Sequence, residues 1–63
     1  MAQRIRAFRK LKGYTQDELA RRLGVSIAVL GSIERGTRKA DDKMIDKIAE
    51  ALAVPRDELQ LNA

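Results

Sequence analysis

Several side chains in this sequence have chemistry suited to a phosphate backbone. Thr15 and Gln16 fall at the start of a predicted helix, where unpaired backbone N–H groups and the positive end of the helix dipole attract anions. Arg35, Arg38 and Lys39 place three cations within five residues, and cations of this kind pair with phosphates. These residue types at these positions indicate a surface that binds a polyanion.

The charge of the chain is divided unequally along its length. Residues 1–39 contain ten Lys and Arg residues and three acidic ones, a net charge of +7, whereas residues 40–63 carry a net charge of −3. A basic first part followed by a mildly acidic second part indicates that one face meets a polyanion. Charge alone also fits the alternative that scattered Lys and Arg keep a small domain soluble.

Other classes of function lack the residues that they need. The 63 residues include no His and no Cys, which removes the usual zinc ligands, the commonest general base and any disulfide. The carboxylates form no recognisable catalytic pair, so we expect no enzyme, no metal site and no cofactor. Phe8 and Tyr14 are the only aromatic residues, too few for the stacking surface of an RNA or single-strand binder. No apolar stretch has the length of a membrane span or a signal peptide, so we expect a cytoplasmic protein without a membrane partner.

Hydrophobic spacing and capping residues predict one all-α domain over residues 1–63, with five helices in a compact arrangement. The expected ranges are residues 2–11, 16–23, 27–35, 42–52 and 56–60. The start signals are a capping box formed by Thr15 and Glu18, then Ser26 and Asp41, and the end signals are Gly13, Gly24 and Gly36. The residues expected to face the core are Ile5, Phe8, Leu11, Leu19, Ala20, Leu23, Leu30, Ile33, Met44, Ile45, Ile48, Ala49, Leu52 and Leu59.

The run from Thr15 to Gly36 has the spacing of a helix-turn-helix. With Gln16 counted as the first position, the small residue Ala20 is fifth, where two helices cross, and Gly24 is ninth, where the turn needs a positive φ. Apolar residues occupy the fourth, eighth, tenth, fifteenth and eighteenth positions: Leu19, Leu23, Val25, Leu30 and Ile33. This pattern predicts a helix-turn-helix core over about residues 15–36, a unit that holds one helix in the DNA major groove.

Four longer motifs lie between Ile5 and Leu59: R-x-F-R-K-x-K-G-Y-T-Q-D-E-L-A, L-G-V-S, I-E-R-G-T-R-K and I-A-E-A-L-A-V-P-R-D-E-L. In these motifs the chain resembles the lambda-repressor/Cro-like family of phage and bacterial regulators. The resemblance implies a five-helix domain that binds a pseudo-palindromic operator on double-stranded DNA as a homodimer, with the third helix in the major groove. It therefore implies a transcriptional regulator, most often a repressor.

The resemblance also implies which residues hold the DNA backbone. Family members use a Gln at the position of Gln16 to grip the backbone, and they use the loop after the third helix to hold flanking phosphates. Together with the start of the second helix, these roles give the expected backbone contacts: Thr15, Gln16, Arg35, Thr37, Arg38 and Lys39.

The third helix should present one outward face made by positions 27, 28, 31, 32 and 35, and family geometry turns that face into the groove. The expected base contacts are Ser26, Ile27, Ala28, Gly31 and Ser32. The first turn of this face holds no side chain that forms bidentate hydrogen bonds with a base, and Ile27 and Ala28 offer only apolar contact, for example to thymine methyl groups. Gly31 disfavours a helix by about 1 kcal/mol relative to alanine, which is easier to explain if the backbone or the DNA approaches closely there.

Three further residues have expected structural roles. The resemblance implies a partly buried salt bridge between Arg9 and Glu34, which would join the first and third predicted helices. Ala53 stands where relatives usually have glycine after the fourth helix, and alanine disfavours a left-handed cap at that position.

The partner of the chain has an alternative that the sequence leaves open. Leu59 and Leu61 near the C-terminus are candidate exposed residues for a dimer contact, although single exposed leucines are also normal on monomers. The same fold could instead serve as a protein-interaction module, for example an antitoxin or a protein that binds a partner regulator, through its apolar third helix or the Leu59–Leu61 end.

Overall fold

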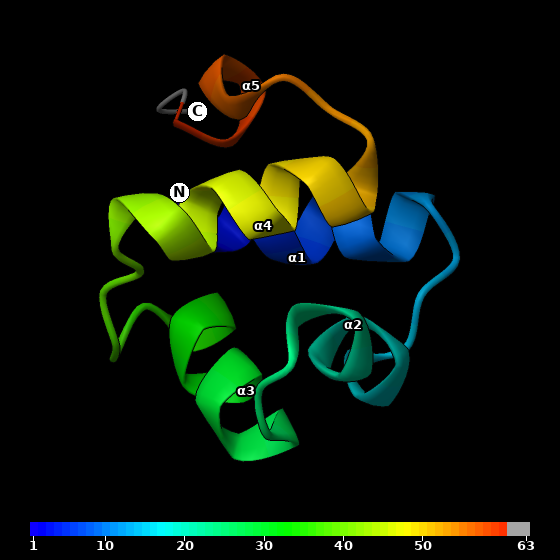
Figure 1. The fold of residues 1–63 in the computed structure, drawn as a ribbon, viewed down its shortest axis with the longest axis vertical. Coiled ribbons are helices and arrows are strands. Elements are labelled where there is room, and N and C mark those ends of the chain that lie inside the picture. The colour runs from blue at the N-terminus through cyan, green and yellow to red at the C-terminus, as the bar shows by residue number, and fades with distance from the viewer. Residues whose placement is uncertain (61–63) are drawn as a thin grey trace.

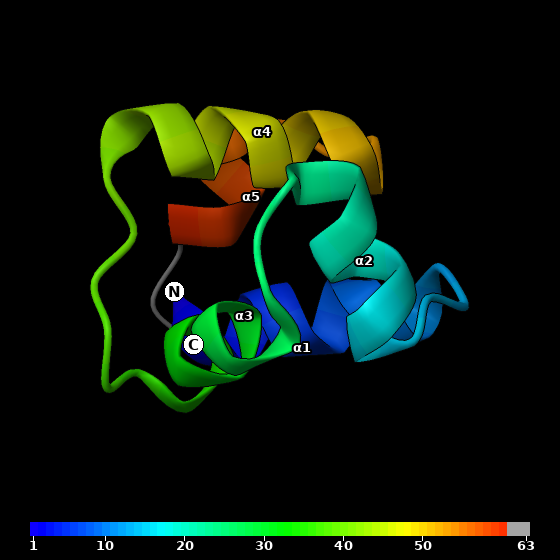
Figure 2. The same ribbon diagram turned by 60° about the horizontal axis from the view of Figure 1, so that its bottom comes forward.

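The computed structural model describes residues 1–60, which form five helices. These are α1 (Ala2–Leu11), α2 (Gln16–Leu23), α3 (Ile27–Arg35), α4 (Asp42–Leu52) and α5 (Arg56–Gln60), and they confirm the predicted all-α class. In Figure 1, α4 lies in front of α1, with α5 above this pair and α2 and α3 below it. Figure 2 shows α5 beneath α4, and α5 packs on both α1 and α4.

Side-chain caps begin three of these helices. The Thr15 hydroxyl accepts a hydrogen bond from the Glu18 amide at 3.1 Å, and the Glu18 carboxylate accepts one from the Thr15 amide at 3.1 Å, which completes the predicted capping box. The Ser26 hydroxyl accepts from the Val29 amide, and the Asp41 carboxylate accepts from the Met44 amide. The hydrogen bond from the Thr15 amide is the main reason that the pKa of Glu18 lies below its ordinary value.

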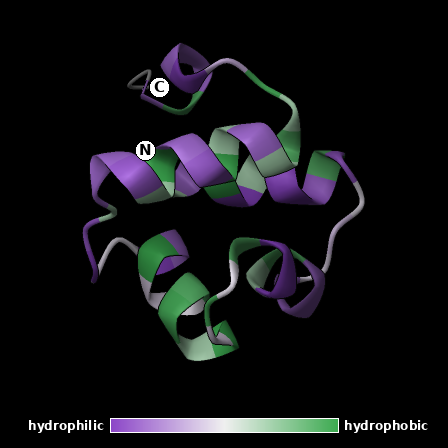
Figure 3. Ribbon diagram, viewed as in Figure 1, coloured by the Kyte–Doolittle hydropathy of each residue, from purple (hydrophilic) through white to green (hydrophobic). Residues whose placement is uncertain are grey.

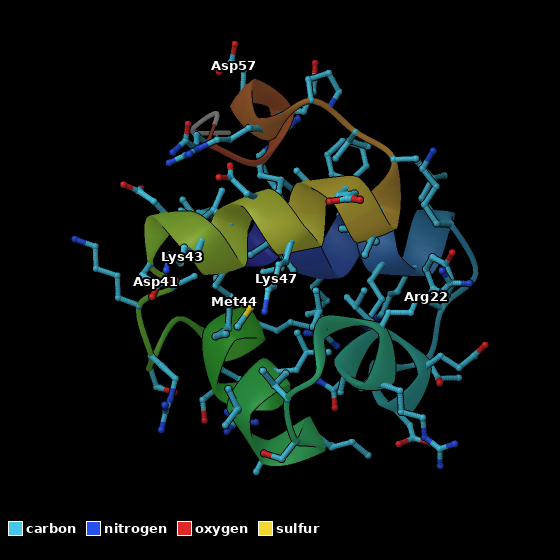
Figure 4. The ribbon with its side chains drawn as sticks, in the orientation of Figure 1. Arg22, Asp41, Lys43, Met44, Lys47 and Asp57 are labelled. Carbon is cyan, nitrogen blue, oxygen red and sulfur yellow. The ribbon has the colours of Figure 1, made fainter. Side chains whose placement is uncertain are left out.

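The core is built from one apolar face of each helix. Its fully buried large side chains are Ile5, Leu19, Leu30, Ile48, Leu52 and Leu59. Figure 3 shows that α3 is hydrophobic over most of its length, whereas α1 and α4 alternate between hydrophobic and hydrophilic residues. Met44 points from α4 toward α3 in Figure 4 and is half-buried against the core. The domain therefore relies on helix packing, as a chain without cysteine must.

The prediction that Leu11 faces the core is wrong, because its side chain is 75% exposed. The series Ile5, Phe8, Leu11 turns by about 120° around a helix of 3.6 residues per turn, so its last member leaves the buried face. The buried series on α1 is Ile5 and Arg9, four residues apart. Arg9, and not Leu11, is thus the second inward residue of α1, and it is charged.

The sequence places Leu59 both among the core residues and among the exposed dimer candidates; the core position is confirmed, and the exposed dimer contact is wrong. The side chain of Leu59 is 0% exposed, because α5 packs against both α1 and α4 and directs Leu59 into the core of the single chain. Ion pairs hold α5 in this position, from Arg4 to Glu58 and from Arg56 to Asp42 and Asp46. Leu61 lies outside the described residues.

The end of α4 differs from expectation in its backbone. Ala53 has φ 56° and ψ 44°, and it is the only residue other than glycine with a positive φ among residues 1–60. The Val54 amide donates to the Ala49 carbonyl at 3.1 Å, and the Ala53 amide donates to the Glu50 carbonyl at 3.1 Å, the pattern of a Schellman cap. The cap is therefore left-handed in spite of the alanine Cβ, because these hydrogen bonds and the packing of α5 require this turn.

Substituting glycine at this position should stabilise the domain. Ala53→Gly removes a left-handed alanine, a conformation that is unfavourable by roughly 1–2 kcal/mol. After the extra backbone entropy of glycine is subtracted, we expect a gain of about 1 kcal/mol and a rise in Tm of roughly 4–8 °C for a domain of this size. Ala7→Gly in the exposed part of α1 is the matched control and should lose about 1 kcal/mol. Equal losses in both variants, measured by thermal unfolding, would contradict this interpretation of Ala53.

Candidate nucleic-acid interface

The α2–α3 pair has the geometry of a helix-turn-helix. Ala20 is 1% exposed, and α2 packs directly on α3. Gly24 has φ 72°, and the Val25 amide donates to the Ala20 carbonyl at 3.0 Å, so the chain leaves α2 through a tight left-handed turn. Figure 1 shows both helices on the side of the molecule away from α5. The second helix of the motif is thus held with one face outward.

The outward face of α3 is apolar at its start and cationic at its end. Ile27 is 47% exposed, Ala28 and Arg35 are exposed, and Ser32 is half-buried. Gly31 is buried, which corrects the expectation that it lies open on this face. A Cβ atom at Gly31 would lie 3.1 Å from Arg35 Nη1 and 3.7 Å from Gln16 Nε2, so these two side chains cover its backbone.

The hydroxyl groups on and around α3 already have partners within the chain. Ser26 Oγ accepts from the Val29 amide at 3.1 Å, and Ser32 Oγ donates to the Ala28 carbonyl at 3.0 Å. The Thr37 hydroxyl donates to the Ser32 carbonyl at 3.1 Å. Ser26 keeps its hydroxyl hydrogen for an outside acceptor, and Ser32 keeps lone pairs for an outside donor.

Arg9 and Glu34 form a bidentate ion pair between α1 and α3. Arg9 Nε lies 2.7 Å from Glu34 Oε2, and Arg9 Nη2 lies 3.2 Å from Glu34 Oε1. The two side chains are 10% and 2% exposed. Arg9 Nη1 also donates to the Tyr14 carbonyl at 2.9 Å, and Gln16 Nε2 donates to Glu34 Oε1 at 3.2 Å. This network joins α1, α3 and the start of α2.

A shallow depression at the start of α2 brings several predicted backbone contacts together. Its lining residues are Arg6, Arg9, Thr15, Gln16, Glu34 and Arg35. Arg6 and Arg35 are exposed, and neither has a carboxylate partner among the described residues. Arg6 was absent from the residues predicted for this site. Its spacing of three residues from Arg9 places both on one face of α1 and could have identified it.

The loop after α3 extends this cationic surface beyond the C-terminal end of the helix. Gly36 has φ 79°, and the amides of Thr37 and Arg38 donate to the Ser32 carbonyl at 3.0 and 3.3 Å. Thr37, Arg38 and Lys39 are exposed. The loop is therefore tied to the last turn of α3 by its backbone, while its side chains stay accessible.

In the acidic part of the chain, Arg56 pairs with two carboxylates. Arg56 Nη2 lies 2.6 Å from Asp42 Oδ1, and Arg56 Nη1 lies 3.0 Å from Asp46 Oδ1. The hydrogen bond to Asp42 is the main reason that the pKa of Arg56 is raised. Asp41 and Lys43 lie at the start of α4 in Figure 4.

Residues 1–60 contain no group of three or more His, Cys, Asp or Glu side chains that could hold a metal ion. Among residues 1–60, no helix is both long enough and apolar enough to cross a membrane.

Comparison with protein families and sequences gives matches over most of the chain. The model of a family described as helix-turn-helix matches residues 5–59. The HTH-type transcriptional regulator YazB of Bacillus subtilis is 54% identical over 56 residues, which cover 89% of this chain and 81% of YazB. A transcriptional regulator in the ATPase CF(0) region of Rhodospirillum rubrum is 40% identical over 57 residues, and this chain spans only about half (53%) of its length.

Two solved structures share the fold over nearly the whole chain. The restriction-modification controller protein C.AhdI of Aeromonas hydrophila has a TM-score of 0.88 and 38% sequence identity, with 92% of this chain and 88% of C.AhdI covered. SinR, a master regulator for biofilm formation solved in complex with DNA, has a TM-score of 0.86 and 37% identity, with 94% of this chain and 98% of SinR covered.

Removing one partner of the buried ion pair should destabilise the domain strongly. Glu34→Ala leaves Arg9 buried without its carboxylate, and we expect a loss of roughly 3–5 kcal/mol in the free energy of unfolding, measured with urea. Asp46→Ala, which removes one exposed partner of Arg56, is the control and should change it by less than about 1 kcal/mol. The double variant Arg9→Met/Glu34→Met should recover most of the loss. Similar small effects of Glu34→Ala and Asp46→Ala would contradict a buried, coupled pair.

Proposed function

The chain belongs to the Cro/C1-type helix-turn-helix family, and on this basis we propose that it is a transcriptional regulator that binds double-stranded DNA in a sequence-specific way. The observation that carries the proposal is the placement of exposed cations and polar donors beside the outward face of α3, in the depression at the start of α2, and in the loop that follows the C-terminal end of α3. This family consists of DNA-binding regulators rather than enzymes. The proposal therefore assigns no catalytic activity to this chain. It also places the chain in the cytoplasm.

In this proposal α3 enters the major groove and two sets of residues hold the phosphates on either side. Thr15 and Gln16 lie at the start of α2, and Thr37, Arg38 and Lys39 lie after α3. Gln16 gives one N–H to Glu34, which leaves its second N–H and the unpaired backbone N–H groups of α2 for a phosphate oxygen. Contacts of this kind fix the position of the protein on the duplex.

The proposed base contacts lie at the start and in the middle of the outward face of α3. Ile27 and Ala28 are exposed and apolar, so they suit thymine methyl groups in the major groove. Ser26 can donate its hydroxyl hydrogen and Ser32 can accept a hydrogen bond. Gly31 gives a base no side chain to contact. In the free chain the side chains of Gln16 and Arg35 cover the backbone of Gly31. The sequence predicts that Arg35 contacts the DNA backbone.

The proposal includes a homodimer on a pseudo-palindromic operator and a repressor role. Pairing of two subunits would place two α3 helices one helical turn of DNA apart, about 34 Å. Leu59 takes no part in this pairing, because it is buried within its own chain. A dimer bound across a promoter would block the polymerase without any further chemistry.

A protein partner is the alternative that one observation favours. Ile27 is one of the few large apolar side chains that are exposed among the described residues, and it lies at the start of α3. An antitoxin-like or regulator-binding surface would use this residue in an apolar contact. The two functions differ in their response to salt: about five phosphate contacts per subunit give a log–log slope of affinity on salt near −4.5, whereas an apolar interface gives a slope near zero.

Binding selection against a randomised duplex library tests the proposed function. Selected sequences should form a pseudo-palindrome with thymine in the half-sites, and their affinity should fall steeply with salt. Binding without an enriched sequence would contradict sequence-specific reading. The absence of any binding would favour the protein-partner alternative.

The loop after α3 gives a specific prediction. Arg38→Ala should weaken binding to all duplexes by a similar factor and reduce the magnitude of the salt slope by about 1, because a phosphate contact carries no sequence information. Fluorescence anisotropy titrations at several salt concentrations, on a selected and a scrambled duplex, measure both quantities. Lys47→Ala on α4, outside the proposed contacts, is the control and should leave the slope unchanged. A changed sequence preference in Arg38→Ala would show that Arg38 reads a base.

A further inference from the structure

The side chain of Arg35 lies along the outward face of α3. Its Cα belongs to the last turn of the helix, yet its Nη1 atom is 3.1 Å from the place that a Cβ atom of Gly31 would occupy. Side chains in a helix lean toward its N-terminus, and the missing side chain of Gly31 leaves space for the guanidinium group one turn back. Arg35 Nη2 also approaches Ser32 Oγ at 3.5 Å. The charge of Arg35 is thus at the centre of the face, away from the loop that follows the helix.

We propose that Arg35 is the specificity-determining residue of α3 and that it reads a guanine in the major groove. A guanidinium group can donate two parallel hydrogen bonds to guanine O6 and N7. On the outward face formed by Ile27, Ala28, Gly31, Ser32 and Arg35, it is the only group with this capacity. The inference rests on the proposed function, since it assumes that this face enters the groove of a duplex.

The surroundings of Arg35 favour a base contact over a phosphate contact. No carboxylate pairs with Arg35 among residues 1–60, so its donors are available without the loss of an ion pair. Gln16, on one side, and the loop of Arg38 and Lys39, on the other, already supply groups for the flanking phosphates. When α3 lies in the major groove between these two sets of phosphate contacts, the base edges are the part of the DNA nearest to the middle of α3.

The proposal also explains why residue 31 is glycine. From the sequence alone, this glycine indicates only that the backbone or the DNA approaches α3 closely there. A side chain at position 31 would compete with the guanidinium group for the same space. Glycine therefore lets one long side chain from the last turn serve a position in the middle of the helix. Ile27 and Ala28 are then apolar neighbours that exclude water beside this contact.

The test is a double-mutant cycle between the protein and the duplex. The wild-type chain is titrated with its selected duplex and with duplexes in which each selected guanine is replaced in turn by 7-deazaguanine, which lacks the N7 acceptor, or by adenine. We expect one guanine per half-site whose change to adenine weakens wild-type binding by about 5- to 150-fold, the discrimination of one good bidentate pair. 7-Deazaguanine should weaken binding at the same position. Arg35→Ala should lose this discrimination, so that it binds the duplexes with guanine, 7-deazaguanine or adenine at that position with nearly equal affinity.

Arg38→Ala is the matched control, because it removes a nearby exposed arginine that is assigned to a phosphate. It should keep the full guanine discrimination while its affinity falls for every duplex. Arg35 is exposed, and equal melting curves of Arg35→Ala and wild type establish that both are folded.

Two results would overturn the proposal. One is an Arg35→Ala variant that weakens all duplexes by the same factor and still discriminates guanine; the other is a wild-type selection without any guanine in the half-sites. Both leave sequence-specific DNA binding intact, and so they differ from a failure of the proposed function, in which the wild type shows no selected sequence or no binding.

Discussion

The buried ion pair between Arg9 and Glu34 is the interaction on which the rest of the surface depends. It links α1 to α3 through two hydrogen bonds. Arg9 also donates to the Tyr14 carbonyl, and Glu34 also accepts from the side-chain amide of Gln16. A pair of apolar residues could give comparable stability in its place, so its particular contribution is geometric. It fixes the start of α2 relative to α3, and these are the two elements that must meet one duplex together.

The distribution of charge follows from this arrangement. Acidic side chains on α4 and α5 pair with Arg56 and Arg4, which ties the C-terminal helices to the core. Glu34, the one acidic side chain in the depression at the start of α2, is neutralised by Arg9. Arg6 and Arg35 are left without carboxylate partners among the described residues. A chain of modest net charge, +4, thus presents one strongly cationic face.

Local sequence signals predicted the helices of this domain well, and long-range packing decided most of what they missed. The capping residues Thr15, Ser26 and Asp41 act within one helical turn, so the helix starts could be placed from the sequence alone. The exposure of Leu11 follows from the helical period itself, because a spacing of three residues drifts away from the buried face. Whether Leu59 is buried or exposed depends on where α5 docks, and the left-handed Ala53 depends on the same docking. Neither of these two is encoded in a short window of sequence. For the interface, the motif spacing located α3, whereas the position of the Arg35 guanidinium over Gly31 depends on the side-chain conformation of Arg35, which the spacing does not specify.

The most direct measurement of this interface is an NMR titration of the ¹⁵N-labelled chain with a duplex obtained by binding selection. If α3 enters the groove between two phosphate anchors, the amide signals of Gln16, residues 27–32 and residues 37–39 should show the largest changes and saturate together. Signals from α5 and from Leu11 should stay nearly constant. Changes concentrated on α5 or on the Leu11 end of α1, with α3 unaffected, would contradict a helix-turn-helix interface in this chain.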